Sequence, residues 1–176
     1  MKTPGLFTAY YKNPEATREV KDEEGWFHTG DIGQFIDGKF LKLTDRKKEI
    51  FKTSAGKYVA PQAVEAKLKE SFFVEQAVVV GDGQKYAAAL IVPSFDAIKE
   101  FCRVESIAYT SDAEIIKNEK VLAKFRVEVE NANKDLAPYE RVKKYHLLPS
   151  ELSVANGELT PTLKPKRRII QEKYKT

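Results

Sequence analysis

The chain has 176 residues and a formal net charge of +4; 42% of its residues are hydrophobic and 32% are charged, which favours a packed domain over wholesale disorder. Its longest apolar runs, Ala77–Gly81 and Ala87–Pro93, are far shorter than the ~20 residues that span a bilayer, and its start has no apolar signal core. The single cysteine, Cys102, and two histidines exclude a disulfide framework, a cysteine-built zinc site and a histidine-rich metal centre. We therefore expect a protein of the reducing cytoplasm.

Two hairpins are predicted in the first third of the chain. Residues 1–24 form a polar lead-in that we expect to be extended. Residues 31–44 alternate in hydrophobicity around Asp37-Gly38, and Asp-Gly is a strong hairpin signal. A charged run, Asp45–Glu49, separates this hairpin from a second, short one over residues 50–59.

The rest of the chain predicts a small sheet with helices packed on it. Periodicity and turn signals give a helix from Pro61 to about Ser71, then two strands joined at Asp82-Gly83. Further along we expect two helices, over residues 94–101 and 119–136, and then a strand over residues 141–148 that could pair with the previous two. A turn-rich loop over residues 150–165 and a basic helix at the C-terminus follow. The fold class is α+β, with a small mixed or antiparallel sheet.

Four short motifs occur in order and resemble those of the adenylate-forming enzymes, which include acyl-CoA synthetases, peptide-synthetase adenylation domains and luciferases. The last of them has the form seen in long-chain fatty acyl-CoA synthetases. The motifs are GWFHTGD at 25–31, TDRKKE at 44–49, KTSAGKYVAP at 52–61 and LTPTLKPKR at 159–167. The resemblance covers almost the whole chain. It implies that residues 1–44 are the truncated end of a large N-terminal domain, and that residues 45–176 are a mobile C-terminal domain.

The resemblance implies roles for three residues around the first domain boundary. Asp31 would accept hydrogen bonds from two ribose hydroxyls, and Arg46 would reach the nucleotide. Asp45 would be the hinge about which the C-terminal domain rotates. The residues alone leave simpler interpretations open: a turn aspartate that bonds its own backbone for Asp31, and a solvated charge run for Asp45.

The resemblance also implies roles for Gly56 and Lys164. Gly56 would line the route of coenzyme A, although a turn glycine serves the fold equally well. Lys164 would be catalytic, because an ammonium beside the α-phosphate offsets the charge that develops during adenylation. Many members have glycine before this lysine, whereas this chain has Leu163. Lys166 therefore remains a rival for the catalytic role, and a merely basic tail remains an alternative.

The implied function is that of a long-chain fatty acid–CoA ligase, which activates a fatty acid with ATP and transfers the acyl group to coenzyme A. Mg²⁺ would be bound outside this chain, which alone should be inactive. The implied partners are the missing N-terminal domain of the same protein and, peripherally, a membrane, reached through the acyl substrate. If Lys164 is catalytic, Lys166, Arg167 and Arg168 are expected only to solvate the last helix.

Two alternatives stay open. The first is another adenylating enzyme, for aryl, acetyl or amino acids, with a carrier-protein thiol as acceptor. The second is a small module whose basic C-terminal helix contacts nucleic acid or anionic lipid. No basic strand interleaved with aromatic residues is present, so we expect no nucleic-acid partner.

Overall fold

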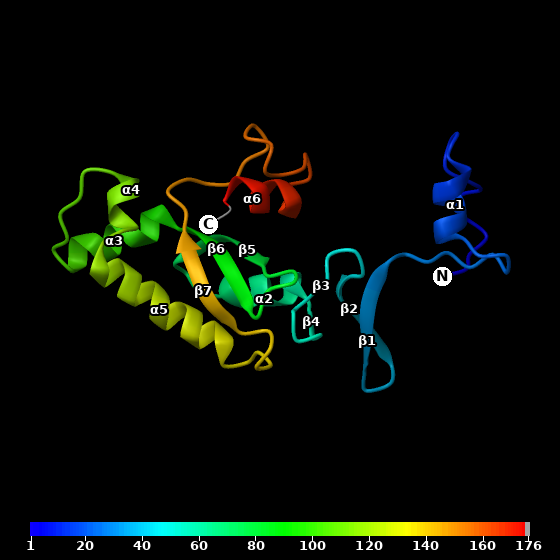
Figure 1. Ribbon diagram of the computed structural model, residues 1–176, viewed down its shortest axis with the longest axis horizontal. Helices are drawn as coiled ribbons and strands as arrows, with labels where there is room; N and C mark the ends of the chain where they lie inside the picture. Colours follow the sequence, from blue (N-terminus) through cyan, green and yellow to red (C-terminus); the bar gives the residue numbers. More distant parts are fainter. Residues whose placement is uncertain (175–176) are drawn as a thin grey trace. The chain divides into compact units, whose positions relative to one another are not determined.

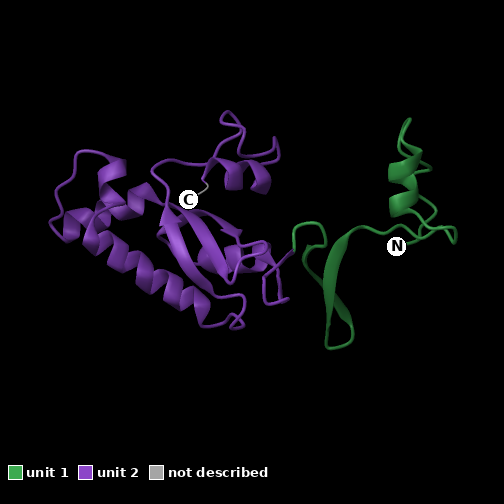
Figure 2. Cartoon of the chain, viewed as in Figure 1, with its two compact units in different colours: residues 1–50 green, residues 51–176 purple. Residues whose placement is uncertain are grey.

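The computed structural model describes residues 1–174. The chain divides into two compact units, one over residues 1–50 and the other from Phe51 onward (Figure 2). Both units are built from short helices and small sheets, as the predicted α+β class requires. The chain therefore divides six residues beyond the predicted boundary, which was placed before Asp45.

Unit 1 begins with a helix that the sequence did not predict. Helix α1, Pro14–Val20, is capped by Asn13, whose side chain accepts a hydrogen bond from the Ala16 amide at 3.0 Å. The expectation that residues 1–24 are extended is therefore wrong for this segment. The helix has no buried residue, so it lacks the apolar stripe by which a helix is recognised in a sequence.

The rest of unit 1 is the first predicted hairpin. Strands β1 (Asp31–Ile36) and β2 (Phe40–Arg46) pair in antiparallel register. Asp37 and Gly38 form the turn with φ of 52° and 67°. The Lys39 amide closes the turn by donating to the Ile36 carbonyl at 3.1 Å. Asp and Gly are residue types that tolerate positive φ, so the Asp-Gly signal is confirmed.

Unit 2 contains the other elements (Figure 1). They are β3 (Phe51–Lys52), β4 (Tyr58–Val59), α2 (Pro61–Leu68), β5 (Val74–Val80), β6 (Ala87–Pro93), α3 (Phe95–Val104), α4 (Asp112–Ile115), α5 (Glu119–Asn133), β7 (Val142–Leu147) and α6 (Arg167–Lys173). Strands β3 and β4 form the second hairpin. In the three-stranded sheet β5 and β6 are antiparallel, and β7 joins β6 in parallel, so the sheet is mixed.

Strands β5 and β6 of this sheet are covered on both faces. On one face, α2, α3 and α5 pack on alternate residues such as Val79 and Ile91. On the other face, the C-terminal loop and α6 cover Val78 and Val92, with Ile170 of α6 fully buried. Figure 1 shows α5 and α6 on opposite sides of the sheet. Burial on both faces explains why β5 and β6 are almost uninterrupted apolar runs.

Candidate active site

Lys164 lies in a closed loop between β7 and α6. A β-bridge between Leu159 and Pro165 closes the loop. Within it, the Thr160 amide donates to the Lys164 carbonyl at 2.8 Å, and the Lys164 amide donates to the Thr160 hydroxyl at 3.0 Å. Thr160 therefore holds the backbone of Lys164 on both sides. The Lys164 side chain is exposed and can meet a ligand.

Leu163, directly before this lysine, adopts a left-handed backbone conformation with φ of 59°. Its amide donates to the Thr160 carbonyl at 2.8 Å, and its side chain is 69% exposed. Glycine enters this conformation without steric cost, whereas a leucine does not. The chain thus forms a turn suited to glycine at the position where many adenylate-forming enzymes have one.

Lys166, the rival candidate, has a different setting. It is the residue before the first turn of α6, its side chain is half-buried, and its amide donates to the Glu158 carbonyl at 2.7 Å. Lys164 therefore belongs to the exposed loop and Lys166 to the start of the helix.

Arg167 is not a solvated residue of the last helix, and that expectation is corrected here. Its guanidinium donates to both carboxylate oxygens of Glu65 in α2, one of them at 2.9 Å, and to the Val79 carbonyl of β5 at 3.2 Å. The Val79 amide donates to the same carboxylate at 2.7 Å. Glu65 is 102 residues away in the chain, so no local pattern could have indicated the pair.

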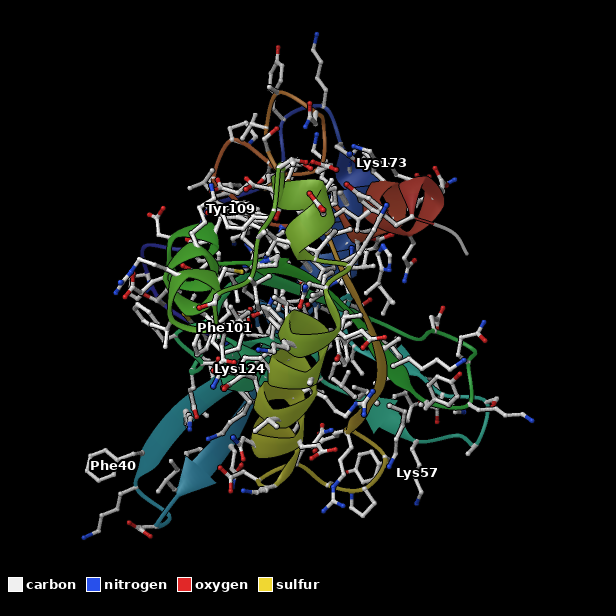
Figure 3. All side chains as sticks on the ribbon, turned by 90° about the vertical axis from the view of Figure 1, so that its left-hand side faces the viewer. Phe40, Lys57, Phe101, Tyr109, Lys124 and Lys173 are labelled. Atoms are coloured by element: carbon white, nitrogen blue, oxygen red, sulfur yellow. The ribbon has the colours of Figure 1, made fainter. Side chains whose placement is uncertain are left out.

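A second buried carboxylate, Glu158, holds the far end of α6. Only 1% exposed, it accepts hydrogen bonds from Lys173 Nζ at 2.8 Å and from the Tyr174 hydroxyl at 2.9 Å. Burial alone would raise the pKa of Glu158, but these hydrogen bonds, with one from the Ser153 amide, outweigh it and lower the pKa. Lys173, labelled in Figure 3, is thus engaged within the protein.

The two predicted nucleotide-binding residues meet in unit 1. Asp31 and Arg46 are opposite each other across β1 and β2, and Arg46 Nε lies 3.2 Å from Asp31 Oδ1. The Asp31 amide donates to the Thr29 hydroxyl at 3.1 Å. The carboxylate of Asp31 is thus oriented by an arginine side chain.

The predicted hinge residue, Asp45, is buried, with 5% of its surface exposed. Its carboxylate accepts a hydrogen bond from the Arg46 amide at 2.6 Å. Both residues belong to β2, two positions further than the strand end predicted at Thr44. The burial argues against the alternative that Asp45 is part of a solvated charge run.

Gly56 forms the turn of the β3–β4 hairpin with φ of 79°. A Cβ atom there would have only Lys52 Cε within 4 Å, at 3.7 Å. The backbone conformation favours glycine, and the space above it is open. Both interpretations of Gly56, as a turn residue and as part of a ligand route, fit this geometry.

Two absences concern the described part of the chain. Residues 1–174 contain no group of three or more histidine, cysteine, aspartate or glutamate side chains that could hold a metal ion. Within the same residues, no helix is both long and apolar enough to cross a membrane.

Comparison with known proteins finds relatives that carry the same name, long-chain-fatty-acid–CoA ligase. A long-chain-fatty-acid–CoA ligase of Mycobacterium tuberculosis is 37% identical over 96% of this chain, and long-chain-fatty-acid–CoA ligase 1 of Homo sapiens is 35% identical over 100% of it. The chain spans 28% and 26% of these relatives, about a quarter of their length. One similar solved structure is the adenylation domain of a carboxylic acid reductase from Segniliparus rugosus, in complex with AMP and a carboxylic acid. It matches this chain with a TM-score of 0.80 and 27% identity. The match covers 98% of this chain and 26% of that one.

The family model for the AMP-binding enzyme C-terminal domain matches residues 48–176. This range includes the hairpin of Gly56, the sheet and the loop of Lys164. The chain therefore belongs to the family of AMP-binding enzyme C-terminal domains.

Proposed function

We propose that this chain is the C-terminal part of a long-chain fatty acid–CoA ligase. Identity of 35–37% to ligases of that name, over nearly the whole chain, is the observation that carries the proposal. The full protein would use ATP to convert a fatty acid into an acyl-adenylate and would then form a thioester with coenzyme A. Mg²⁺ would be held by residues outside this chain.

Lys164 is the catalytic residue in this proposal. A carboxylate oxygen attacks the α-phosphorus of ATP, the bond to the β-phosphate breaks, and pyrophosphate leaves. Negative charge concentrates on the α-phosphate during the attack. The exposed ammonium of Lys164, on a loop whose backbone Thr160 fixes, can offset that charge without first reorganising.

The nucleotide would be held by unit 1. The Asp31 carboxylate would accept hydrogen bonds from the two ribose hydroxyls, and Arg46, 3.2 Å away, would orient it while contacting the nucleotide. In the second half-reaction, rotation about Asp45 would bring the Gly56 hairpin to the site, where it would line the approach of the coenzyme A thiol. The thiol then attacks the acyl carbon and AMP leaves.

Residues 1–44 would complete a larger N-terminal domain of the same protein. Two observations support this: the relatives are about four times longer than this chain, and the β1–β2 hairpin exposes large apolar side chains. The full protein would act in the cytoplasm. It would contact a membrane peripherally, through its acyl substrate.

The test compares Lys164→Ala with Lys166→Ala in the full-length enzyme. We expect Lys164→Ala to lower the rate of adenylation, measured by ATP–pyrophosphate exchange, by two to three orders of magnitude, because one well-placed electrostatic group contributes about 3–4 kcal/mol. Thioester formation from supplied acyl-adenylate should change much less. Arg168→Ala is the control, since the Arg168 side chain is 92% exposed. Loss of adenylation in Lys166→Ala alone would reassign the catalytic role to Lys166.

A carboxylic acid reductase is the second candidate, favoured by the match to its adenylation domain. Both candidates form an acyl-adenylate but differ in the thiol that accepts the acyl group. Incubating the full-length protein with a fatty acid, ATP and either coenzyme A or a phosphopantetheinylated carrier domain distinguishes them.

A further inference from the structure

The Arg167–Glu65 pair joins three parts of unit 2 at one point. Arg167 is the first residue of α6, Glu65 lies in α2, and both bond to the backbone of Val79 in β5. The side chains are 16% and 9% exposed, respectively. When a guanidinium contacts both carboxylate oxygens, the two side chains have one defined relative orientation. In an exposed ion pair of two long side chains, the orientation is not fixed in this way.

This pair lies at the base of the Lys164 loop. The loop fixes its own shape through the Leu159–Pro165 bridge and the hydrogen bonds of Thr160. Those contacts are internal, so they do not determine where the loop sits on the sheet. Arg167 follows the loop directly, and its guanidinium donates hydrogen bonds to Glu65 of α2 and to the Val79 carbonyl of β5, which are parts of the main core.

Stability alone does not account for the pair. Removing two charges from water costs so much that a buried ion pair often contributes no more than well-packed apolar residues of the same volume. What apolar residues do not supply is a directional contact. Ile170, one turn along α6, already provides apolar burial between α6 and the sheet.

We propose that Glu65 and Arg167 are positioning residues, which hold the Lys164 loop at a defined place on the sheet so that its ammonium meets the reacting phosphate. This inference rests on the catalytic role proposed for Lys164. Neither side chain contacts the substrate; they act through the backbone between Arg167 and Lys164.

The test uses three variants of the full-length enzyme that remove the pair in different ways. Arg167→Lys keeps the charge but loses the two-pronged geometry. The double variant Glu65→Leu/Arg167→Met removes both charges and leaves no buried charge unpaired. Glu65→Gln is a milder third variant that keeps the side-chain volume. Arg168→Lys is the control, because among residues 1–174 the ion pair of Arg168 is an exposed one with Glu172.

We expect the adenylation kcat of Arg167→Lys and of the double variant to fall about tenfold to a hundredfold, the cost of misplacing a catalytic group by about 1 Å. KM for ATP and thioester formation from supplied acyl-adenylate should change by much less. Amide hydrogen exchange over residues 159–166 should become faster while the midpoint of thermal unfolding of the double variant stays near that of the parent. The control should match the parent in every measurement.

Normal adenylation and normal exchange in the folded double variant and in folded Arg167→Lys would show that the pair has only a structural role. Lys164→Ala, assayed in parallel, separates this inference from the proposed function. If Lys164→Ala adenylates normally, the catalytic role of Lys164 is wrong. The exchange of residues 159–166 still decides, independently of activity, whether Glu65 and Arg167 position the loop.

Discussion

Leu163 departs from the residue type that the resemblance predicted, yet its backbone adopts a conformation that suits glycine. The resemblance predicted a glycine before Lys164, the proposed catalytic residue, and the left-handed φ of 59° at Leu163 is a conformation that glycine adopts easily. The leucine side chain is 69% exposed, so no burial compensates for the steric cost. The loop is instead held by the contacts of Thr160.

Substitution of Leu163 should separate steric cost from chain entropy. Leu163→Gly removes a cost of about 1–2 kcal/mol but adds freedom to the unfolded chain, so we expect the free energy of unfolding to change by less than about 1 kcal/mol. Leu163→Val places a β-branched residue at positive φ and should destabilise by about 1 kcal/mol more than leucine does. Urea unfolding measures both. A valine variant as stable as the parent would contradict the left-handed conformation.

The pH dependence of stability should report on Glu158. Its pKa is lowered in the folded protein from an ordinary value of 4.5, so the unfolded chain binds the proton more tightly. The carboxylate therefore contributes stability that is present above about pH 4.5 and is lost as the pH falls through the folded pKa. We expect Glu158→Gln to be less stable than the parent at pH 7, with the difference shrinking below pH 4.5 in urea unfolding. Glu172→Gln, which removes an exposed carboxylate paired with Arg168, is the matched control.

Single residues divide clearly into those the sequence could predict and those it could not. Asp31 and Arg46 each lie in a short, contiguous motif that the sequence shows directly, and the structure brings them together as an ion pair. The partnership of Arg167 with Glu65 depends on how α6 docks against α2. No pattern within a short window contains that information, since the pair forms only when the tertiary structure does.

At the scale of elements, turn chemistry predicted more than hydrophobic periodicity did. Asp37-Gly38 predicted a hairpin correctly because the turn requires those residue types. Helix α1 was missed because it buries nothing, and α4 because its four residues are too few to show a period. The pairing of β7 with the sheet was predicted, but its parallel direction follows from the crossover through α3 to α5.

Gly81, between β5 and β6, is an element boundary where backbone segments approach closely. A Cβ atom there would lie 2.8 Å from the Tyr86 carbonyl oxygen and 3.2 Å from Ala87 Cα, and neither can move without shifting β6. We expect Gly81→Ala to destabilise unit 2 by about 2–3 kcal/mol. Gly83→Ala is the matched control: its φ of 67° costs about 1 kcal/mol, but the space is open. Equal midpoints in urea unfolding would contradict the close approach at Gly81.

At the scale of the whole molecule, the two units differ in how their apolar residues are covered. In unit 2, each face of the central sheet has its own buried cluster. In unit 1, the β1–β2 hairpin leaves large apolar side chains in contact with solvent. The alternation of apolar and polar residues predicted the hairpin but not this exposure. Such alternation indicates that a hairpin has an apolar face, but it does not indicate what buries that face.

The exposed face can be assigned from the strand register. Phe35 lies opposite Leu41 and Gly33 opposite Leu43, so these residues share one face of the hairpin, and a Cβ on Gly33 would lie 2.7 Å from Leu41 Cδ1. The three apolar side chains are 60–69% exposed. Phe40, labelled in Figure 3, is also 69% exposed but belongs to the opposite face, with Ile36. A contiguous apolar patch on a two-stranded hairpin favours association with another surface.

We expect the 176-residue chain to self-associate as its concentration rises, and the variant Phe35→Ser/Leu41→Ser/Leu43→Ser to remain monomeric at concentrations where the parent associates. The physical reason is that association removes this patch from water, at about 25 cal/mol per Å² of apolar surface. Phe72→Ser is the control, because Phe72 in unit 2 is 79% exposed but lies outside the patch. Sedimentation velocity over a concentration series measures the effect. If the triple variant associates as strongly as the parent, or if Phe72→Ser alone abolishes association, the hairpin face is not the surface responsible.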